Sequence, residues 1–236
     1  PYLLMVLSQG GVQLYEAVND VIVDEVRNDD FPFKSNPHYI THSDKRSQAS
    51  LMDNMLREYF NKVDKALVSV HNQTHLPCVV ISTEQNHSHL MHVADRPAVY
   101  VGHSAINYNA MAEHELGKQA WTDVIEPLQK ERRTQAIGEM QEAVAGTGVL
   151  TDLQEIYQAA IDGRGDLLIV HESFAQPVLM KDERTFDLID DPTVPNAIDD
   201  IVSVIAWEVV AKGGRSVFTQ QDQFKSLGKI ALKPRY

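Results

Sequence analysis

The pattern of apolar and polar residues predicts a mixed α/β chain. An unbroken apolar run at residues 2–8 predicts a strand that is buried on both faces. Alternating residues at 12–18 predict the return strand of a hairpin, which turns at Gln9-Gly10-Gly11. Shorter apolar runs predict three more strands in the first half of the chain, at 21–23, 77–82 and 98–101.

The clearest helical pattern covers residues 50–70. Apolar residues recur there at helical spacing and leave the polar residues on the opposite face; they are Leu51, Met55, Leu56, Tyr59, Phe60, Val63, Leu67 and Val70. A second predicted helix, at 84–92, lies between the predicted strands at 77–82 and 98–101. Strand, helix and strand in this order predict a crossover unit and a sheet that is covered on both faces.

A long helical pattern begins near Met111 and ends at Gly146-Thr147-Gly148. Pro127 is predicted to kink or interrupt this helix, because proline lacks the N–H that a helix interior needs. The glycine pair is predicted to mark a domain boundary. The chain is therefore divided into residues 1–147 and residues 148–236.

The second predicted domain also mixes helices and strands. A capping-box pattern at Thr151-Asp152-Leu153-Gln154 begins a helix that ends at Gly163. Another helix is predicted at 197–212, where Gly213-Gly214 closes it. Strands are predicted at 167–170, 186–189, 216–219 and 230–232, the first two of them buried.

The 236-residue chain is acidic, with a formal net charge of −12. This charge argues against broad, sequence-independent binding of nucleic acid, which needs clustered Lys and Arg, and DNA is not an expected partner. A few local contacts with RNA remain compatible with it. No apolar run reaches the ~18–20 residues that cross a bilayer, so no membrane partner is expected.

Cys78 is the only cysteine, so no intrachain disulfide can form. It lies in Leu76-Pro77-Cys78-Val79-Val80-Ile81, where a buried, unreactive thiol is expected. A reducing, cytoplasmic location fits this usage. The chain opens at Pro1, inside a predicted strand and without an initiator methionine, so a preceding N-terminal region is expected.

Ten histidines raise the question of a metal site. His87, His89 and His92 are close in sequence, but a helical pair that binds one metal usually has i,i+4 spacing and an acidic neighbour. His87 and His89 do not share a helix face. The distances to the other candidates do not follow from the sequence; these are His71, His75, His103 and His114. No metal and no cofactor are therefore expected, and no dinucleotide fingerprint, Walker loop or nucleophile elbow occurs.

Several stretches resemble the archaeo-eukaryotic class-1 release factors and Pelota. The ending resembles their last domain, with Gly213-Gly214 before a strand, then Leu227-Gly228-Lys229-Ile230-Ala231-Leu232-Lys233-Pro234-Arg235-Tyr236. The stretch at 163–170 is similar to the entry of that domain. Three other stretches resemble the middle domain of these proteins. They are the opening hairpin, the long helix with Arg57, Tyr59, Phe60, Val63 and Asp64, and the stretch at 76–81. The chain most resembles the bacterial archaeo-eukaryotic release factor-like family.

The resemblance implies two α/β domains. The first would have a ribonuclease-H-like topology, and the second would be an α/β/α sandwich like that of kink-turn-binding ribosomal proteins. In release factors, a Gly-Gly-Gln loop before the long helix helps to place a water on the peptidyl-tRNA ester. The matching stretch here is Lys45-Arg46-Ser47-Gln48, which keeps the glutamine and lacks the two glycines.

The loss of the glycines leaves three interpretations of this loop open. Glycine permits positive φ and a close backbone approach, which Arg46 and Ser47 reach only at a steric cost. Gln48 either retains a catalytic role in ester hydrolysis or is a relic in a surface loop. Alternatively, Lys45 and Arg46 contact RNA phosphates.

The leading hypothesis is a translation-associated release or rescue factor-like protein. It would bind the ribosome or tRNA, lack the Gly-Gly-Gln motif and lack standard peptidyl-tRNA hydrolase activity. One alternative is a binding module outside translation that uses the C-terminal domain for a protein or small-molecule partner. Another is a divergent hydrolase, so whether the chain is an enzyme stays open.

Overall fold

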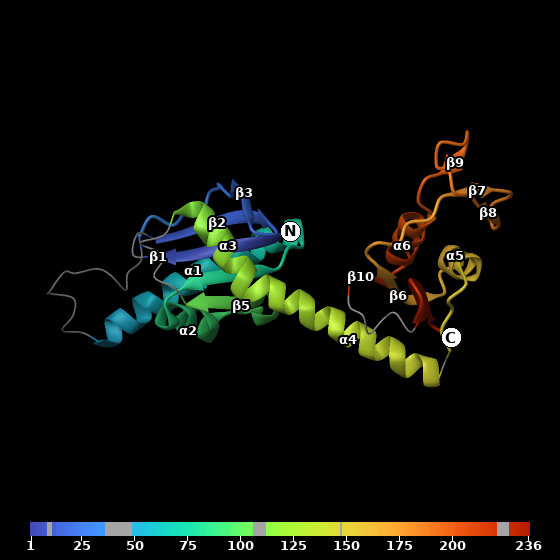
Figure 1. Ribbon diagram of the computed structural model, residues 1–236. Helices are drawn as coiled ribbons and strands as arrows, with labels where there is room; N and C mark the ends of the chain where they lie inside the picture. Colours follow the sequence, from blue (N-terminus) through green and yellow to red (C-terminus); the bar gives the residue numbers. More distant parts are fainter. Residues whose placement is uncertain (9–10, 36–48, 106–111, 147, 221–226) are drawn as a thin grey trace. The chain divides into compact units, whose positions relative to one another are not determined.

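The computed structural model describes two compact units. Contacts divide the chain into Pro1–Gln129 and Lys130–Tyr236, and we call these unit 1 and unit 2. The division falls inside one helix, α4 (Glu126–Ala145). The domain limits at 147 and 148 stay a prediction. The described residues are 1–8, 11–35, 49–105, 112–146, 148–220 and 227–236 (Figure 1).

Unit 1 contains a five-stranded sheet in the order β3-β2-β1-β4-β5. Neighbouring strands are antiparallel from β3 to β1, whereas β1, β4 and β5 run parallel. The strands are β1 (Tyr2–Ser8), β2 (Gly11–Val18), β3 (Val21–Glu25), β4 (Cys78–Ser82) and β5 (Tyr100–Ala105). The predicted hairpin and crossover unit are confirmed, and the ribonuclease-H-like assignment stays a prediction.

Helices cover both faces of this sheet. One face packs against α1 (Ala49–Thr74) and α2 (Glu84–Val93), whose core side chains include Phe60, Leu67 and Leu90. The other face packs against α3 (Glu113–Ala120) through Leu116 and Ala120. Successive side chains of β1 point to opposite faces of the sheet, and both faces are packed against helices. This explains why the apolar run of β1 is continuous. A 3₁₀ turn, η3 (Pro97–Val99), occupies the start of the predicted strand at 98–101.

The predicted interruption near Pro127 takes the form of a π-helical turn. This turn, η5 (Trp121–Ile125), joins α3 to α4, and the N–H of Glu126 donates to the Trp121 carbonyl five residues back. Pro127 follows directly, as the second residue of α4, so the π-helical turn lies where a proline cannot continue the regular i→i−4 hydrogen bonding. The helical path continues through the proline.

Unit 2 is built around a three-stranded sheet in the order β10-β6-β11. One face packs against α5 (Leu153–Ile161) and α6 (Ile201–Ala211), and the other packs against Ala136, Ile137 and Met140 of α4. The strands are β6 (Gly165–His171), β10 (Arg215–Thr219) and β11 (Ile230–Pro234). The sheet therefore lies between α5 and α6 on one face and α4 on the other, which is the predicted α/β/α layering. The likeness to kink-turn-binding ribosomal proteins stays a prediction.

Two expectations for unit 2 need correction. The helix predicted at 197–212 begins only at Ile201, because Asp200 caps it and Asn196 has a positive φ of 64°. The strand at 186–189 is not a buried core strand: only Phe186 of β8 is buried. It belongs to a second small sheet, β8 (Phe186–Leu188), β7 (Val178–Met180) and β9 (Ala197–Ile198).

Both ends of α5 lie close to their predicted positions, but the N-cap residue differs from the predicted one. The N-cap is Asp152 rather than Thr151, and its carboxylate accepts from the N–H groups of Gln154 and Glu155. Gly163 ends the helix as predicted, with φ 71°. Among the described residues, no helix is both long and apolar enough to span a membrane.

Candidate functional site

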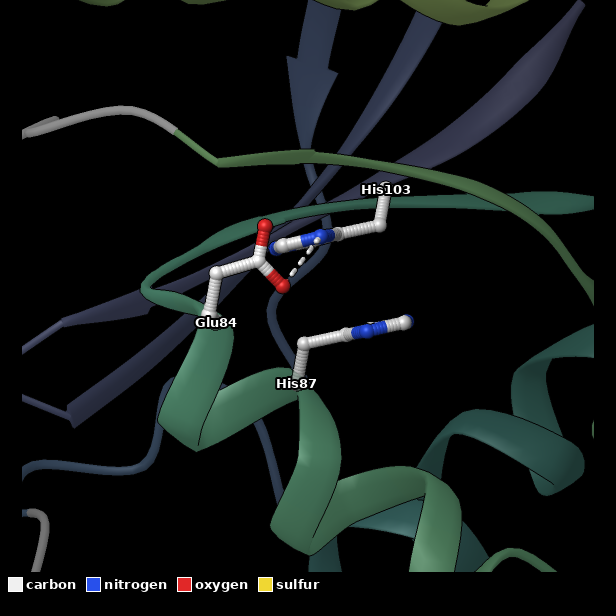
Figure 2. A group of neighbouring side chains, drawn as sticks. All are labelled: Glu84, His87 and His103. Atoms are coloured by element: carbon white, nitrogen blue, oxygen red, sulfur yellow. Dashed lines mark ion pairs between the residues drawn. The ribbon is translucent and has the colours of Figure 1, made fainter.

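The most distinctive polar cluster lies at the carboxyl ends of the parallel strands β4 and β5. It consists of Glu84, His87 and His103, and we call it the histidine cluster (Figure 2). Ligand atoms of all three side chains lie within 4.8 Å of one another. In open α/β sheets, ligands bind preferentially beyond the carboxyl ends of the strands, so this location is favourable for a functional site.

Local sequence explains how the three side chains meet. Thr83 caps α2 directly after β4, because its hydroxyl accepts from the Asn86 N–H at 3.3 Å. Glu84 and His87 are three residues apart in the first turns of that helix, so they share a face. His103 comes from β5, where it is paired with Val80 of β4. The parallel register therefore brings a strand residue to the start of the crossover helix.

The two imidazole rings are stacked. Their centroids are 4.0 Å apart and their planes differ by 4°. Glu84 Oε2 lies 4.0 Å from His103 Nδ1, which is too long for a hydrogen bond. Figure 2 shows the carboxylate beside the His103 ring, with His87 parallel to that ring. The side chain of Glu84 is 81% exposed and that of His103 only 11%.

Ser82 fixes the tautomer of His103. The Ser82 hydroxyl donates to the Thr83 carbonyl at 2.9 Å, so its oxygen can only accept from His103 Nε2, which lies 3.0 Å away. The Ser82 carbonyl, 3.2 Å from the same Nε2, is also an acceptor. Nε2 therefore carries a hydrogen, so the free lone pair of an uncharged ring would lie on Nδ1, on the side of Glu84.

Electrostatics keep His87 neutral near pH 7. Burial lowers the pKa of His87 below its usual value, His103 lowers it further, and Glu84 acts in the opposite direction. A neutral imidazole has a free lone pair, so His87 can bind a metal. The cluster is thus suited to metal coordination.

A polar groove lies nearby, between α1 and α2. It has a volume of about 370 Å³, and Arg57, His89 and His92 line it together with Asp53 and Asn54. His89 also stacks on Phe60, with ring centroids 5.9 Å apart. The groove therefore places one arginine and two histidines near the start of α1.

The three residues predicted for the loop lie outside the described part of the chain. Gln48, Lys45 and Arg46 belong to the stretch at 36–48 that directly precedes α1. Their predicted roles, catalytic for Gln48 and RNA-binding for Lys45 and Arg46, stay predictions. Cys78 is buried as expected, and burial raises the pKa of its thiol.

Sequence reasoning considered the histidines of the cluster but grouped them differently. It compared His87 with His89 and His92 along one helix, whereas the structure pairs His87 with His103 of the next strand. A signal was present, since Glu84-x-x-His87 directly follows a strand that a crossover helix joins to a parallel neighbour. The register that selects His103 over other positions was not available from the sequence.

Comparison with known proteins agrees with this architecture. The fold of the chain is similar to that of the Pelota domains in a solved structure. The profile described as Bacterial archaeo-eukaryotic release factor family 3 matches residues 1–164. The chain belongs to this family. A search of curated proteins gives no significant match.

A solved structure with a TM-score above 0.5 shows the same fold at low sequence identity. The Pelota chain of a structure titled as ribosome-bound archaeal Pelota and ABCE1 aligns with 100% of this chain at 15% identity and a TM-score of 0.56. Dom34 from S. cerevisiae, described as a translation termination-like factor that interacts with Hbs1, aligns over 100% at 13% identity and a TM-score of 0.42. This chain covers 62% of the former and 63% of the latter.

Proposed function

We propose that this protein is a translation-associated factor that binds the ribosome or tRNA. The observation that carries the proposal is the family match over residues 1–164. The fold likeness to an archaeal Pelota chain, whose structure is described as ribosome-bound, supports it. Relatives in fold that act on ribosomes make translation the first process to test.

The contact with RNA would be local, because the whole chain carries a net charge of −12. Arg57 and the two groove histidines offer hydrogen-bond donors close to the start of α1. Lys45 and Arg46 precede that helix in sequence and would add positive charge beside it. A few phosphate contacts of this kind give binding that weakens as salt rises.

We further propose that the factor acts without the hydrolysis typical of release factors. Arg46 and Ser47 stand where those proteins have two glycines, so the backbone of this loop has less freedom to reach a buried ester. Gln48→Ala should then leave peptidyl-tRNA turnover unchanged. A clear fall in turnover would instead assign Gln48 a catalytic role. The protein partner predicted for the C-terminal domain is a separate proposal, which belongs to the alternative of a binding module outside translation.

Sedimentation of ribosomal particles tests the main proposal. Purified protein should co-migrate with ribosomal particles at low salt and dissociate at moderate salt. Lys45→Glu/Arg46→Glu should abolish most of the binding. The matched control is Lys130→Glu/Arg132→Glu, which changes the charge equally at two exposed positions of α4. Failure of the unaltered protein to co-migrate at either salt concentration would contradict the proposal.

A further inference from the structure

We propose that Glu84, His87 and His103 bind one divalent transition-metal ion, for which Zn²⁺ is the expected occupant. The set offers one carboxylate oxygen and two imidazole nitrogens, and the ligand atoms lie within 4.8 Å of one another. Two histidines and one carboxylate are a ligand set that zinc accepts, with one coordination position left open.

The distances between the ligand atoms are close to those of a zinc site, but they are somewhat longer. Zinc lies about 2.0–2.2 Å from imidazole nitrogen and carboxylate oxygen. Glu84 Oε2 and His103 Nδ1 are 4.0 Å apart, whereas two ligand atoms of a tetrahedral zinc site are separated by about 3.4 Å, so one of the two side chains must move inward. The exposed Glu84 side chain can adjust its position without disturbing the core.

His103 is already oriented as a ligand. Ser82 accepts the Nε2 hydrogen through both its hydroxyl and its carbonyl, so Nδ1 keeps its lone pair on the side of Glu84. Histidines that bind metals usually donate their other N–H to a backbone carbonyl or a carboxylate, which fixes the ring and its tautomer. Ser82 provides this support here.

His87 must turn before it can share an ion with His103. A metal lies close to the plane of each imidazole that binds it, and the two rings are parallel and stacked. Rotation about the Cβ–Cγ bond of His87 meets this need, because such terminal torsions have broad minima.

The site would face solvent at the carboxyl edge of the sheet. Glu84 is exposed, whereas both histidines are partly buried. An ion held there would present its open position outward, where water or an anionic oxygen ligand such as phosphate could bind. The proposal does not depend on ribosome binding, because it concerns an ion held by three side chains of unit 1.

Calorimetric titration of the tag-free full chain with Zn²⁺ tests the proposal. We expect saturable binding of one ion. Loss of a supporting residue around a metal ligand commonly costs about 10–100-fold in affinity. Each of the variants Glu84→Gln, His87→Gln and His103→Gln removes one ligand. Each should therefore weaken Zn²⁺ binding by about tenfold or more. The control His114→Gln removes an exposed histidine of unit 1 and should bind as the unaltered protein does.

Glu84→Gln keeps the test decisive if His103→Gln disturbs folding, because Glu84 is exposed and Gln retains its size. Substitution by Co²⁺ gives an independent readout: visible absorption typical of tetrahedral or five-coordinate Co²⁺ should appear and should be lost in Glu84→Gln. Absence of saturable Zn²⁺ binding would overturn the proposal. Unchanged affinity in all three ligand variants would also overturn it, because the ion would then bind elsewhere.

Discussion

At the scale of single residues, Asp64 is unusual because it is an acidic side chain buried in the hydrophobic core of unit 1. It lies on the inner face of α1 and is fully buried. Tyr100 donates its hydroxyl to Asp64 Oδ1 at 2.7 Å, and the Asp95 N–H donates to Oδ2 at 3.0 Å. Burial and this hydrogen bond raise the pKa of Tyr100, so the phenol stays protonated and remains a donor. The carboxylate thus ties α1 to the start of β5.

Tyr100→Phe should destabilise unit 1 by about 1.5–3 kcal/mol, the usual contribution of a hydrogen bond to a charged group. The substitution removes the hydrogen bond from Tyr100 to Asp64 Oδ1. The hydrogen bond from the Asp95 N–H to Oδ2 is kept. Urea unfolding followed by Trp121 fluorescence measures the change. A Trp207→Phe background removes the only other tryptophan.

Tyr236→Phe is the control for this experiment, because Tyr236 is 86% exposed and should tolerate the loss of its hydroxyl. Equal urea midpoints for Tyr100→Phe and Tyr236→Phe would show that the buried hydrogen bond contributes nothing.

The sequence indicated some of these residue roles and concealed others. Asp64 was noted only as part of a resemblance, because helical periodicity cannot tell a buried carboxylate from one at the edge of the polar face. Glu84 and His87 were visible as neighbours on one helix. Their partner His103 depends on the pairing of β4 with β5, which is a long-range property of the sheet.

At the scale of helices and strands, prediction succeeded where an element is long or fully buried. β1, β4 and β6 have continuous apolar runs, and each was placed within two residues of its observed ends, as with β1 at Tyr2–Ser8. β7 and β9 contain only three and two residues, so no periodicity could reveal them. The late start of α6 depends on the Asp200 cap rather than on the apolar pattern that continues upstream.

Two glycine substitutions at element scale should have opposite effects. A Cβ on Gly102 of β5 would lie 2.2 Å from Val124 Cγ1, so Gly102→Ala should destabilise unit 1 by about 1–3 kcal/mol through overpacking. A Cβ on Gly138 of α4 meets nothing within 4 Å, so Gly138→Ala should stabilise unit 2 by about 0.5–1 kcal/mol.

Urea unfolding by Trp121 fluorescence measures the first effect, and Trp207 fluorescence in a Trp121→Phe background measures the second. Each substitution serves as the control for the other, because both add one methyl group. Destabilisation by Gly138→Ala would contradict the open surroundings of that residue.

At the scale of the whole molecule, the second half of α4 belongs with unit 2. Ala136, Ile137 and Met140 are buried against Leu167, Ile169 and Ala231 of the sheet. At the edge of this contact, Glu139 accepts from Arg215 at 2.8 Å and from Lys233 at 2.7 Å. The residues before the glycine pair at 146 and 148 therefore supply one layer of the C-terminal unit.

This packing predicts that a fragment of residues 130–236 is more stable than a fragment of residues 148–236. Without α4, the sheet face that carries Leu167 and Ile169 would lie open to water. Ile137 and Met140 are almost fully buried, and burial of each such side chain contributes about 1.5–3 kcal/mol, so the longer fragment should gain about 3 kcal/mol or more. Chemical unfolding followed by circular dichroism of both fragments measures the difference.

A third fragment separates packing from chain length. Residues 130–236 with Ile137→Asp/Met140→Asp keep the full length but place charges at the buried positions, so this variant should unfold as readily as the 148–236 fragment. If the two unaltered fragments unfold at the same denaturant concentration, α4 contributes no stability to the unit. The domain limit predicted at the glycine pair would then also be the limit of the independently folding unit.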